Sequence, residues 1–150
     1  MLLTIVLFFH ILAAIVAVGF NISYAVWIVR ARREPTHTAF ALKGVKFLDD
    51  RIANPAYGVL LVTGLLLVYL GHYSITTRWI DSALILFVAL IAVAAFVYTP
   101  ALREQVKLAE AGDTSSAAFM RLGTRGQIAG QALGLIVVVI LALMVFKPTI

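Results

Sequence analysis

The sequence predicts an all-α membrane protein, a four-transmembrane-helix antiparallel bundle with both termini outside the cytoplasm. Of its 150 residues, 63% are hydrophobic and 13% are charged, and the mean hydropathy is +1.04. Soluble domains hold about 45–50% apolar and about 25% charged residues. Four long apolar stretches, suited to cross a ~30 Å hydrocarbon layer as helices, alternate with segments that hold nearly all the charge.

The predicted spans cover about residues 2–29, 55–70, 79–98 and 127–146, and nothing marks a second domain within residues 1–150. Strands are excluded because an open sheet in lipid leaves edge groups unpaired, and the runs lack the alternation of a lipid-facing barrel. The first span has no basic segment before it and is longer than the ~7–15-residue apolar core of a cleavable signal. We therefore expect it to remain as a helix.

Basic residues give the predicted orientation. The connections between spans one and two and between spans three and four hold ten of the twelve Lys and Arg residues, whereas only Arg78 and Lys147 lie on the other side. The positive-inside rule then places both long connections in the cytoplasm. The formal net charge of +5 follows from this topology and from contact with anionic lipid, so it does not indicate nucleic-acid binding.

The connection between spans two and three, residues 71–78, is short enough to make these helices antiparallel neighbours. Residues 38–48 carry a broad apolar face that predicts a helix along the membrane surface. Asn54 and Pro55 then predict an N-cap and a first-turn proline for span two.

Thr99 and Pro100 predict the end of span three and the start of a short polar helix in the cytoplasm, which ends at Gly112. Asp113 or Thr114 is expected to cap the helix after it.

Small residues indicate where helices approach closely in a membrane. Gly126, Gly130 and Gly134 follow one another at four-residue steps in span four. This ridge predicts close packing of span four on its neighbours, with a cofactor or dimer contact as the alternative. Gly64 and Gly71 are expected to mark the buried side of span two, one heptad apart.

His10 lies inside the apolar stretch of span one. At about 100° per residue it shares one narrow face with further small and polar residues, namely Ala13, Ala14, Ala17, Asn21 and Tyr24. Polar residues in lipid usually turn inward and often carry function. Two interpretations stay open: a neutral His10 that makes an interhelical hydrogen bond, or an axial ligand to haem iron.

A second haem ligand is less clear. His72 is expected about 10 Å away from His10 in depth, which is awkward for two histidines on opposite faces of one haem. Met144, near the end of span four, is a possible thioether ligand or a packing residue. A polar cluster is expected at the cytoplasmic side, formed by Asp49, Asp50, Arg51, Asn54, Asn21 and Tyr24. Ion pairing at the end of a helix explains such a cluster as well as a functional site does.

Several kinds of site are absent from the sequence. There is no cysteine, which excludes disulfides, thiolate metal sites and cysteine nucleophiles. There is also no phosphate loop, convincing catalytic triad, zincin pattern or metal-carboxylate repeat.

Segments in all four spans resemble a known group when taken together. The chain is similar to a bacterial family of small predicted integral membrane proteins of unknown function. The segments that carry the similarity are FHILAAIVAVGFNISYAVWIVRAR, RIANPAYGVLLVTGLLLVY, WIDSALILFVALIAVAAFVYTPALR and LALMVFKP. The resemblance places that family within the wider CopD-like group, which includes HemJ-type protoporphyrinogen oxidases. The resemblance implies a multi-pass protein of the bacterial cytoplasmic (inner) membrane.

The match to the HemJ type is closest in FHI, where a haem-binding histidine maps onto His10, and in RIANPAYGVLLVTGLLL, which begins at Arg51. The resemblance implies haem b in a four-helix pocket. Ala83 stands where the HemJ type carries an essential lysine, so the resemblance does not extend to protoporphyrinogen oxidation.

The leading hypothesis is a haem b-associated membrane protein in redox or tetrapyrrole handling. Its axial ligand is His10, with Asn21, Tyr24 and Met144 as further cofactor-binding candidates. The alternative is a non-enzymatic accessory or scaffold subunit that packs against partner membrane proteins. A copper-handling or transport role is a weak third hypothesis, because the chain holds three methionines and no methionine cluster. The sequence leaves open whether the protein is an enzyme.

Overall fold

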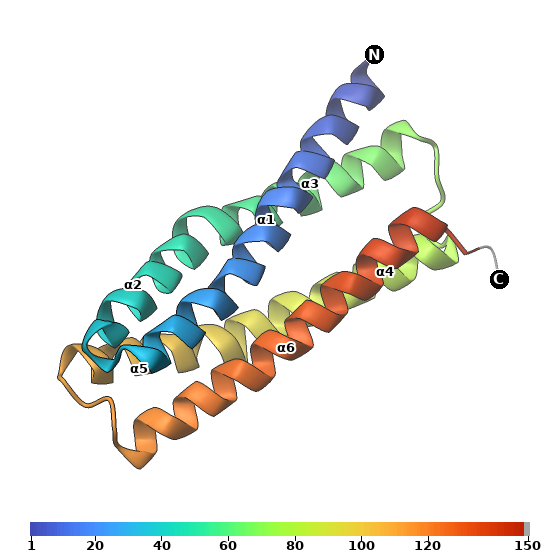
Figure 1. The fold of residues 1–150 in the computed structure, drawn as a ribbon. Coiled ribbons are helices and arrows are strands. Elements are labelled where there is room, and N and C mark those ends of the chain that lie inside the picture. Colours follow the sequence, from blue (N-terminus) through green and yellow to red (C-terminus); the bar gives the residue numbers. More distant parts are fainter. Residues whose placement is uncertain (149–150) are drawn as a thin grey trace.

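The computed structural model describes residues 1–148 and is helical apart from short connections. Figure 1 shows the helices α1 to α6. In chain order the elements are α1 (Leu2–Arg33), the 3-10 turn η1 (Pro35–His37), α2 (Thr38–Leu48), the π-helical turn η2 (Asp49–Ala53), α3 (Asn54–Leu70), α4 (Arg78–Val93), the π-helical turn η3 (Ala94–Tyr98), α5 (Thr99–Glu110) and α6 (Ala117–Phe146). No strand occurs within residues 1–148. Residues 149 and 150, the last of the predicted domain, lie outside the described residues.

Four helical segments are long and apolar enough to cross a membrane: Leu2–Arg33, Pro35–Leu70, Arg78–Glu110 and Ala117–Phe146. The predicted all-α class with four spans is therefore confirmed. The segments run antiparallel, and both chain ends lie at the same end of the bundle, which we call the terminal end (Figure 1). The opposite end, where α1 turns into α2 and α5 into α6, is the loop end.

The helices are longer than the predicted spans, chiefly toward the loop end. The 32 residues of α1 are about 48 Å long, whereas the hydrocarbon layer is about 30 Å thick. Span two is preceded by α2 without a break, span three continues into α5, and α6 begins ten residues before the predicted position 127. The loop end of the bundle therefore extends well beyond what a membrane crossing needs.

Two prolines lie inside continuous helices, each just after a π-helical turn. Asn54 and Thr99, which precede Pro55 and Pro100, both have helical backbone angles. The predicted N-cap at Asn54 and the predicted helix end at Thr99 are therefore wrong. A proline lacks the N–H for an α-helical bond and crowds the carbonyl four residues earlier. The wider turns η2 and η3 absorb both effects, so the helix continues.

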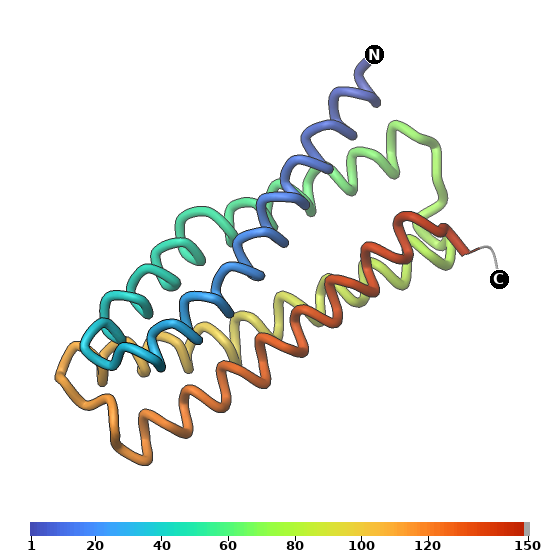
Figure 2. The backbone as a smooth tube through the Cα atoms, in the orientation of Figure 1, coloured from blue at the N-terminus to red at the C-terminus, as the bar shows by residue number. Residues whose placement is uncertain are grey.

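The four rods associate in pairs. In one pair α3 packs along α1, and in the other α4 packs along α6, while α3 and α4 make no close backbone approach. The helices α3 and α4 run antiparallel as predicted. They are joined by residues 71–77 and by the rings of Tyr57 and Phe87, whose centroids lie 6.2 Å apart. Figure 2 shows the two pairs standing apart at the terminal end.

The hydrophobic core lies toward the loop end. It contains buried residues from every α-helix except α3, namely Tyr24, Leu42, Val45, Leu90, Leu102, Val106, Ala109, Ala129 and Leu133, and from the π-helical turns Ala53 and Tyr98. The helix predicted over residues 38–48 is confirmed as α2, which packs against α1 and α5 through its apolar face. Toward the terminal end, residues 2–12 of α1 are all exposed or half-buried. The bundle is therefore tight at one end and open at the other.

The start of α6 is capped by a residue that the sequence did not single out. The Ser116 hydroxyl accepts a hydrogen bond from the Phe119 N–H at 3.1 Å, and the Asp113 carboxylate accepts one from the Ser116 N–H at 3.1 Å. The prediction that Asp113 or Thr114 is the cap is therefore wrong, although Asp113 supports the residue that caps.

Replacing Ser116 by alanine should lower the free energy of unfolding by about 1 kcal/mol, because the N–H of Phe119 loses its acceptor. Denaturant titration of the purified protein in detergent would measure the change. Ser115→Ala is the matched control, because Ser115 is exposed and should leave stability unchanged. Equal loss in both variants would contradict the assignment of the cap.

Candidate functional site

His10 lies against α3, on the inward face of α1. Its Nδ1 is 2.9 Å from the Thr63 hydroxyl oxygen. A Cβ added to Gly64 would lie 3.2 Å from the Cε1 atom of the ring, so the imidazole occupies the space that this glycine leaves free. Ala13 and Ala17 are buried on the same face. The prediction that this face turns inward is confirmed, and Gly64 is half-buried beside the ring.

The hydrogen bonds around His10 favour one assignment of its ring proton. The Thr63 hydroxyl donates to the Val59 carbonyl at 2.6 Å, which uses its one proton. With that proton used, its oxygen accepts from the Nδ1–H of His10, which is the tautomer that this bond favours. A neutral imidazole with its proton on Nδ1 has a lone pair on Nε2. Within residues 1–148, Nε2 has no hydrogen-bond partner, and it is not fully enclosed.

Asn21 forms a second polar contact on the same face of α1, closer to the loop end. Its side-chain amide donates to the Ala17 carbonyl at 2.8 Å and to the Tyr57 hydroxyl at 2.9 Å. Eleven residues separate it from His10, a rise of about 16 Å along the helix. Asn21 and His10 therefore share a face of α1 but not a site.

Tyr24 and Asp49 lie still closer to the loop end. Tyr24 is 3% exposed and Asp49 is 7% exposed. The side-chain amide of Asn54 donates to Asp49 at 3.5 Å, the long limit for a hydrogen bond, and Lys46 forms an ion pair with Asp50. Tyr98, from η3, is also buried, and a Cβ added to Gly130 would lie 4.0 Å from its ring. The predicted polar cluster is therefore present in part: Asp49 and Asp50 have polar partners here, whereas Arg51 and Asn54 are exposed and Asn21 bonds elsewhere.

Met144 is not brought to His10. It is half-buried near the terminal end of α6, a helix that packs mainly on α4 and α5. The polar contact between α1 and α6 is at the loop end, where Arg32 donates to the side-chain oxygen of Gln127 at 2.9 Å.

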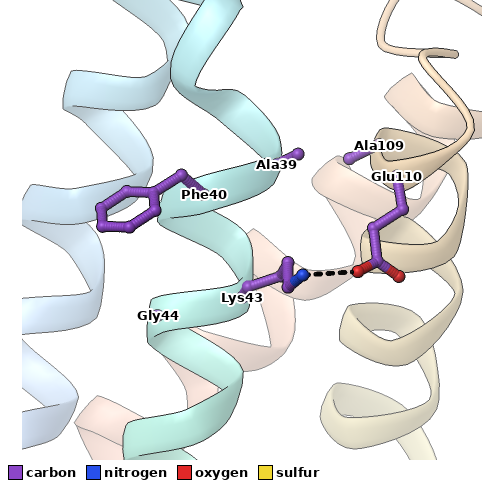
Figure 3. Close-up of a pocket in the computed structure, with 6 residues that line it drawn as sticks. All are labelled: Ala39, Phe40, Lys43, Gly44, Ala109 and Glu110. Carbon is purple, nitrogen blue, oxygen red and sulfur yellow. Dashed lines mark ion pairs between the residues drawn. The ribbon is translucent and has the colours of Figure 1, made fainter.

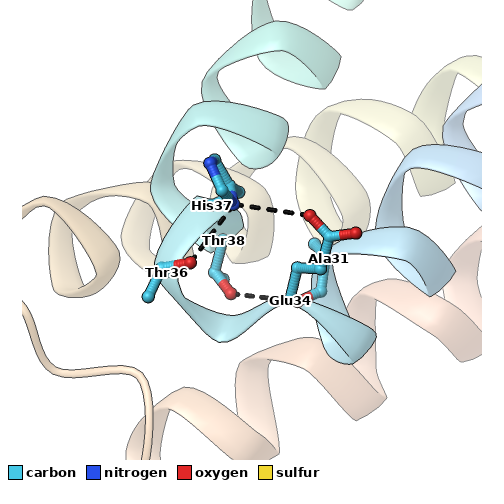
Figure 4. A network of polar contacts seen from close by, with 5 residues as sticks. All are labelled: Ala31, Glu34, Thr36, His37 and Thr38. Carbon is cyan, nitrogen blue, oxygen red and sulfur yellow. Dashed lines mark hydrogen bonds and ion pairs between the residues drawn. The ribbon is translucent and has the colours of Figure 1, made fainter.

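The remaining histidines lie in connections at the two ends of the bundle. His72 is exposed in the turn after α3 with a positive φ of 53°. His37 is exposed near Thr36 and Glu34, as Figure 4 shows. Across residues 1–148, no three His, Asp or Glu side chains gather as metal ligands. Any metal at His10 would therefore be bound by a single histidine from this chain.

The glycine ridge of α6 is only partly used. A Cβ on Gly130 would meet the Tyr98 ring at 4.0 Å, whereas a Cβ on Gly126 or Gly134 would meet nothing within 4 Å. The prediction that the whole ridge packs closely on neighbouring helices is therefore wrong for the single chain.

Grooves occur at the loop end, away from every predicted site residue. One runs between α2 and α5 and is lined by Ala39, Phe40, Lys43, Gly44, Ala109 and Glu110. Figure 3 shows the ion pair of Lys43 and Glu110 across it, at 2.8 Å. The second, between α1 and α2, includes Trp27 and Arg30.

Thr63 is the residue of the His10 site that sequence reasoning missed. A signal was available, because Thr63 is the only serine or threonine in residues 55–70 and directly precedes Gly64. A hydroxyl in an apolar span bonds either its own backbone or a neighbouring helix, and Thr63 does both.

Comparisons with known proteins give one match. Residues 4–148 match the model of the family described as "Predicted integral membrane protein (DUF2269)". No curated protein and no solved structure matches the chain. Because this chain has four helices suited to span a membrane, it contacts the lipid bilayer.

Replacing Tyr57 by phenylalanine should lower the free energy of unfolding by about 0.5–1 kcal/mol, because one N–H of Asn21 loses its interhelical acceptor. Thermal or denaturant unfolding in detergent would measure this. Tyr69→Phe on the same helix is the matched control, because Tyr69 is 77% exposed. Equal stability of Tyr57→Phe and wild type would mean that the contact does not help to join α1 to α3.

Proposed function

Because the chain belongs to this family of predicted integral membrane proteins, whose description names no activity, we propose a function from its polar interior. The protein is a haem b-associated membrane protein in redox or tetrapyrrole handling, with His10 as an axial ligand. One observation carries the proposal. The Val59 carbonyl, the Thr63 hydroxyl and His10 Nδ1 form a chain that leaves Nε2 free.

Chemistry and surroundings at His10 fit such a ligand. In metal-binding histidines, the N–H of the nitrogen that does not bind the metal usually donates a hydrogen bond to a fixed acceptor. This bond sets the ring orientation and makes the metal-binding nitrogen more basic. Here Thr63 is that acceptor, and Gly64 presents no side chain to the ring. A haem b held by the imidazole would supply one-electron chemistry.

The proposal rests on α1 and α3 alone. Asn21 and Tyr24 lie about 16 and 21 Å along the helix from His10, so they do not share its level. Met144, the proposed thioether ligand, is on α6 in the other helix pair. The described chain thus contributes one ligand at this level, and the other axial position is left to a small molecule or a further protein.

The resemblance of FHI and of the segment from Arg51 onward to HemJ-type proteins of the CopD-like group supports haem binding. Ala83 is 3% exposed in α4, so no cation for a porphyrin carboxylate stands at that position. The proposal therefore does not include oxidation of protoporphyrinogen.

A non-enzymatic accessory subunit is the second candidate. It is favoured by the separation of the two helix pairs at the terminal end and by the absence of any neighbour within 4 Å of Gly126 and Gly134. These features leave apolar faces that partner membrane proteins would cover.

Purified protein from haem-replete cells should show a Soret band that disappears in His10→Ala, because the iron loses its ligand. Thr63→Val should weaken haem affinity by about 10–100-fold, since the ring loses its orienting acceptor. His72→Ala is the control and should keep the band, because His72 is exposed in a turn.

A colourless wild-type protein, or a band unchanged in His10→Ala, would contradict the haem proposal. A colourless preparation with a stoichiometric membrane partner would instead support the accessory role.

We also propose that both termini lie outside, in a bacterial cytoplasmic membrane. The chain has no cysteine, so single-cysteine variants report one position each. An impermeant maleimide should label Ser74→Cys in intact spheroplasts and Ser115→Cys only after lysis, because the basic connections remain inside. Both positions are exposed, and the reverse pattern would contradict this orientation.

A further inference from the structure

Asp49 is a buried carboxylate without an ion pair. It is 7% exposed at the first position of η2, and no Lys, Arg or His nitrogen within residues 1–148 lies within 4 Å of it. Lys46 pairs with Asp50 instead, and the charges of Lys46, Asp50 and Arg103 act on Asp49 from a greater distance. Its hydrogen bond from Asn54 is long, at 3.5 Å. Buried charges are normally paired or bound to a cation.

The hydroxyl of Tyr24, on the helix that packs against η2, is a second group without a partner. Tyr24 is 3% exposed, and its oxygen is the one buried side-chain polar atom in residues 1–148 without a hydrogen bond. The helix α1, which carries Tyr24, packs directly on η2, which carries Asp49. An unpaired buried hydroxyl and a buried carboxylate without an ion pair are both costly, so their presence on two elements that pack together points to a missing ligand.

From these two groups we propose that the loop half of the bundle binds a small monovalent cation, with the Asp49 carboxylate and the Tyr24 hydroxyl oxygen as ligands. Both present oxygen lone pairs, which hard cations prefer. One unpaired carboxylate balances one positive charge.

A divalent ion fits less well, because Mg²⁺ and Ca²⁺ usually take several carboxylates and the described residues hold no such cluster. The π-helical turn beneath Asp49 agrees with the proposal, since such turns are frequent at functional sites.

The test is thermal unfolding of the purified full-length protein in detergent, at one pH and constant ionic strength. Sodium or potassium chloride replaces choline chloride stepwise. The unfolding temperature should rise with sodium or potassium and then level off, because an ion that binds only the folded state stabilises it. Choline is too large for a buried site and should have no effect.

Asp49→Asn should raise the half-saturating ion concentration at least about tenfold, because the charged ligand is lost. Tyr24→Phe keeps the ring in the core and should raise it about three- to tenfold, so it tests the site even if Asp49→Asn does not fold. Asp81→Asn and Tyr69→Phe are the matched controls, since both residues are exposed and far from η2, and they should respond as wild type does.

Identical unfolding temperatures of the wild type in sodium, potassium and choline would overturn the proposal. So would an unchanged half-saturating concentration in both Asp49→Asn and Tyr24→Phe. His10→Ala should keep the full cation response, so failure of the haem proposal and failure of the cation site are distinguishable.

Discussion

A polar group that a helix carries into hydrocarbon must find its partner on another helix, because no water is present to replace it. The first helix carries three such groups on one face. His10 meets Thr63 and Asn21 meets Tyr57, whereas the Tyr24 hydroxyl has no hydrogen-bond partner within residues 1–148. Both partners belong to the continuous helix from α2 to α3. Pairing of α1 with this helix is therefore the contact on which the arrangement of polar residues depends.

The prolines extend this pairing beyond the membrane thickness. Because π-helical turns precede Pro55 and Pro100, neither proline ends its helix. The α2 and α5 helices then continue the bundle at the loop end, where the core is densest. The same turn that accommodates Pro55 places Asp49 inside the bundle rather than at a solvent-exposed helix start. A local backbone adjustment thus creates the most strongly polar position of the interior.

The two ends of the bundle differ in what they offer a ligand. The loop half encloses polar groups within a packed core, which suits a small ion. The terminal half leaves the α1 and α3 pair apart from the α4 and α6 pair, which suits a large flat cofactor or another protein (Figure 2). His10 lies on this open side with one nitrogen held and the other free. The two proposed sites therefore differ in size and chemistry and use different residues of one face of α1.

The amino-acid sequence by itself determined that four helices are long and apolar enough to span a membrane, because length and hydropathy are properties of each segment alone. It also determined that His10, Asn21 and Tyr24 turn inward together, since helical periodicity places them on one face. It could not show which residue of another helix each of them meets.

Only the tertiary structure decided that Thr63 holds the imidazole and that Gly126 and Gly134 stay without neighbours. Lipid tails are as apolar as leucine, so hydrophobicity does not select which helices pair or in which register. Short-range packing and hydrogen bonds between distant segments make that choice, and a linear pattern does not encode them.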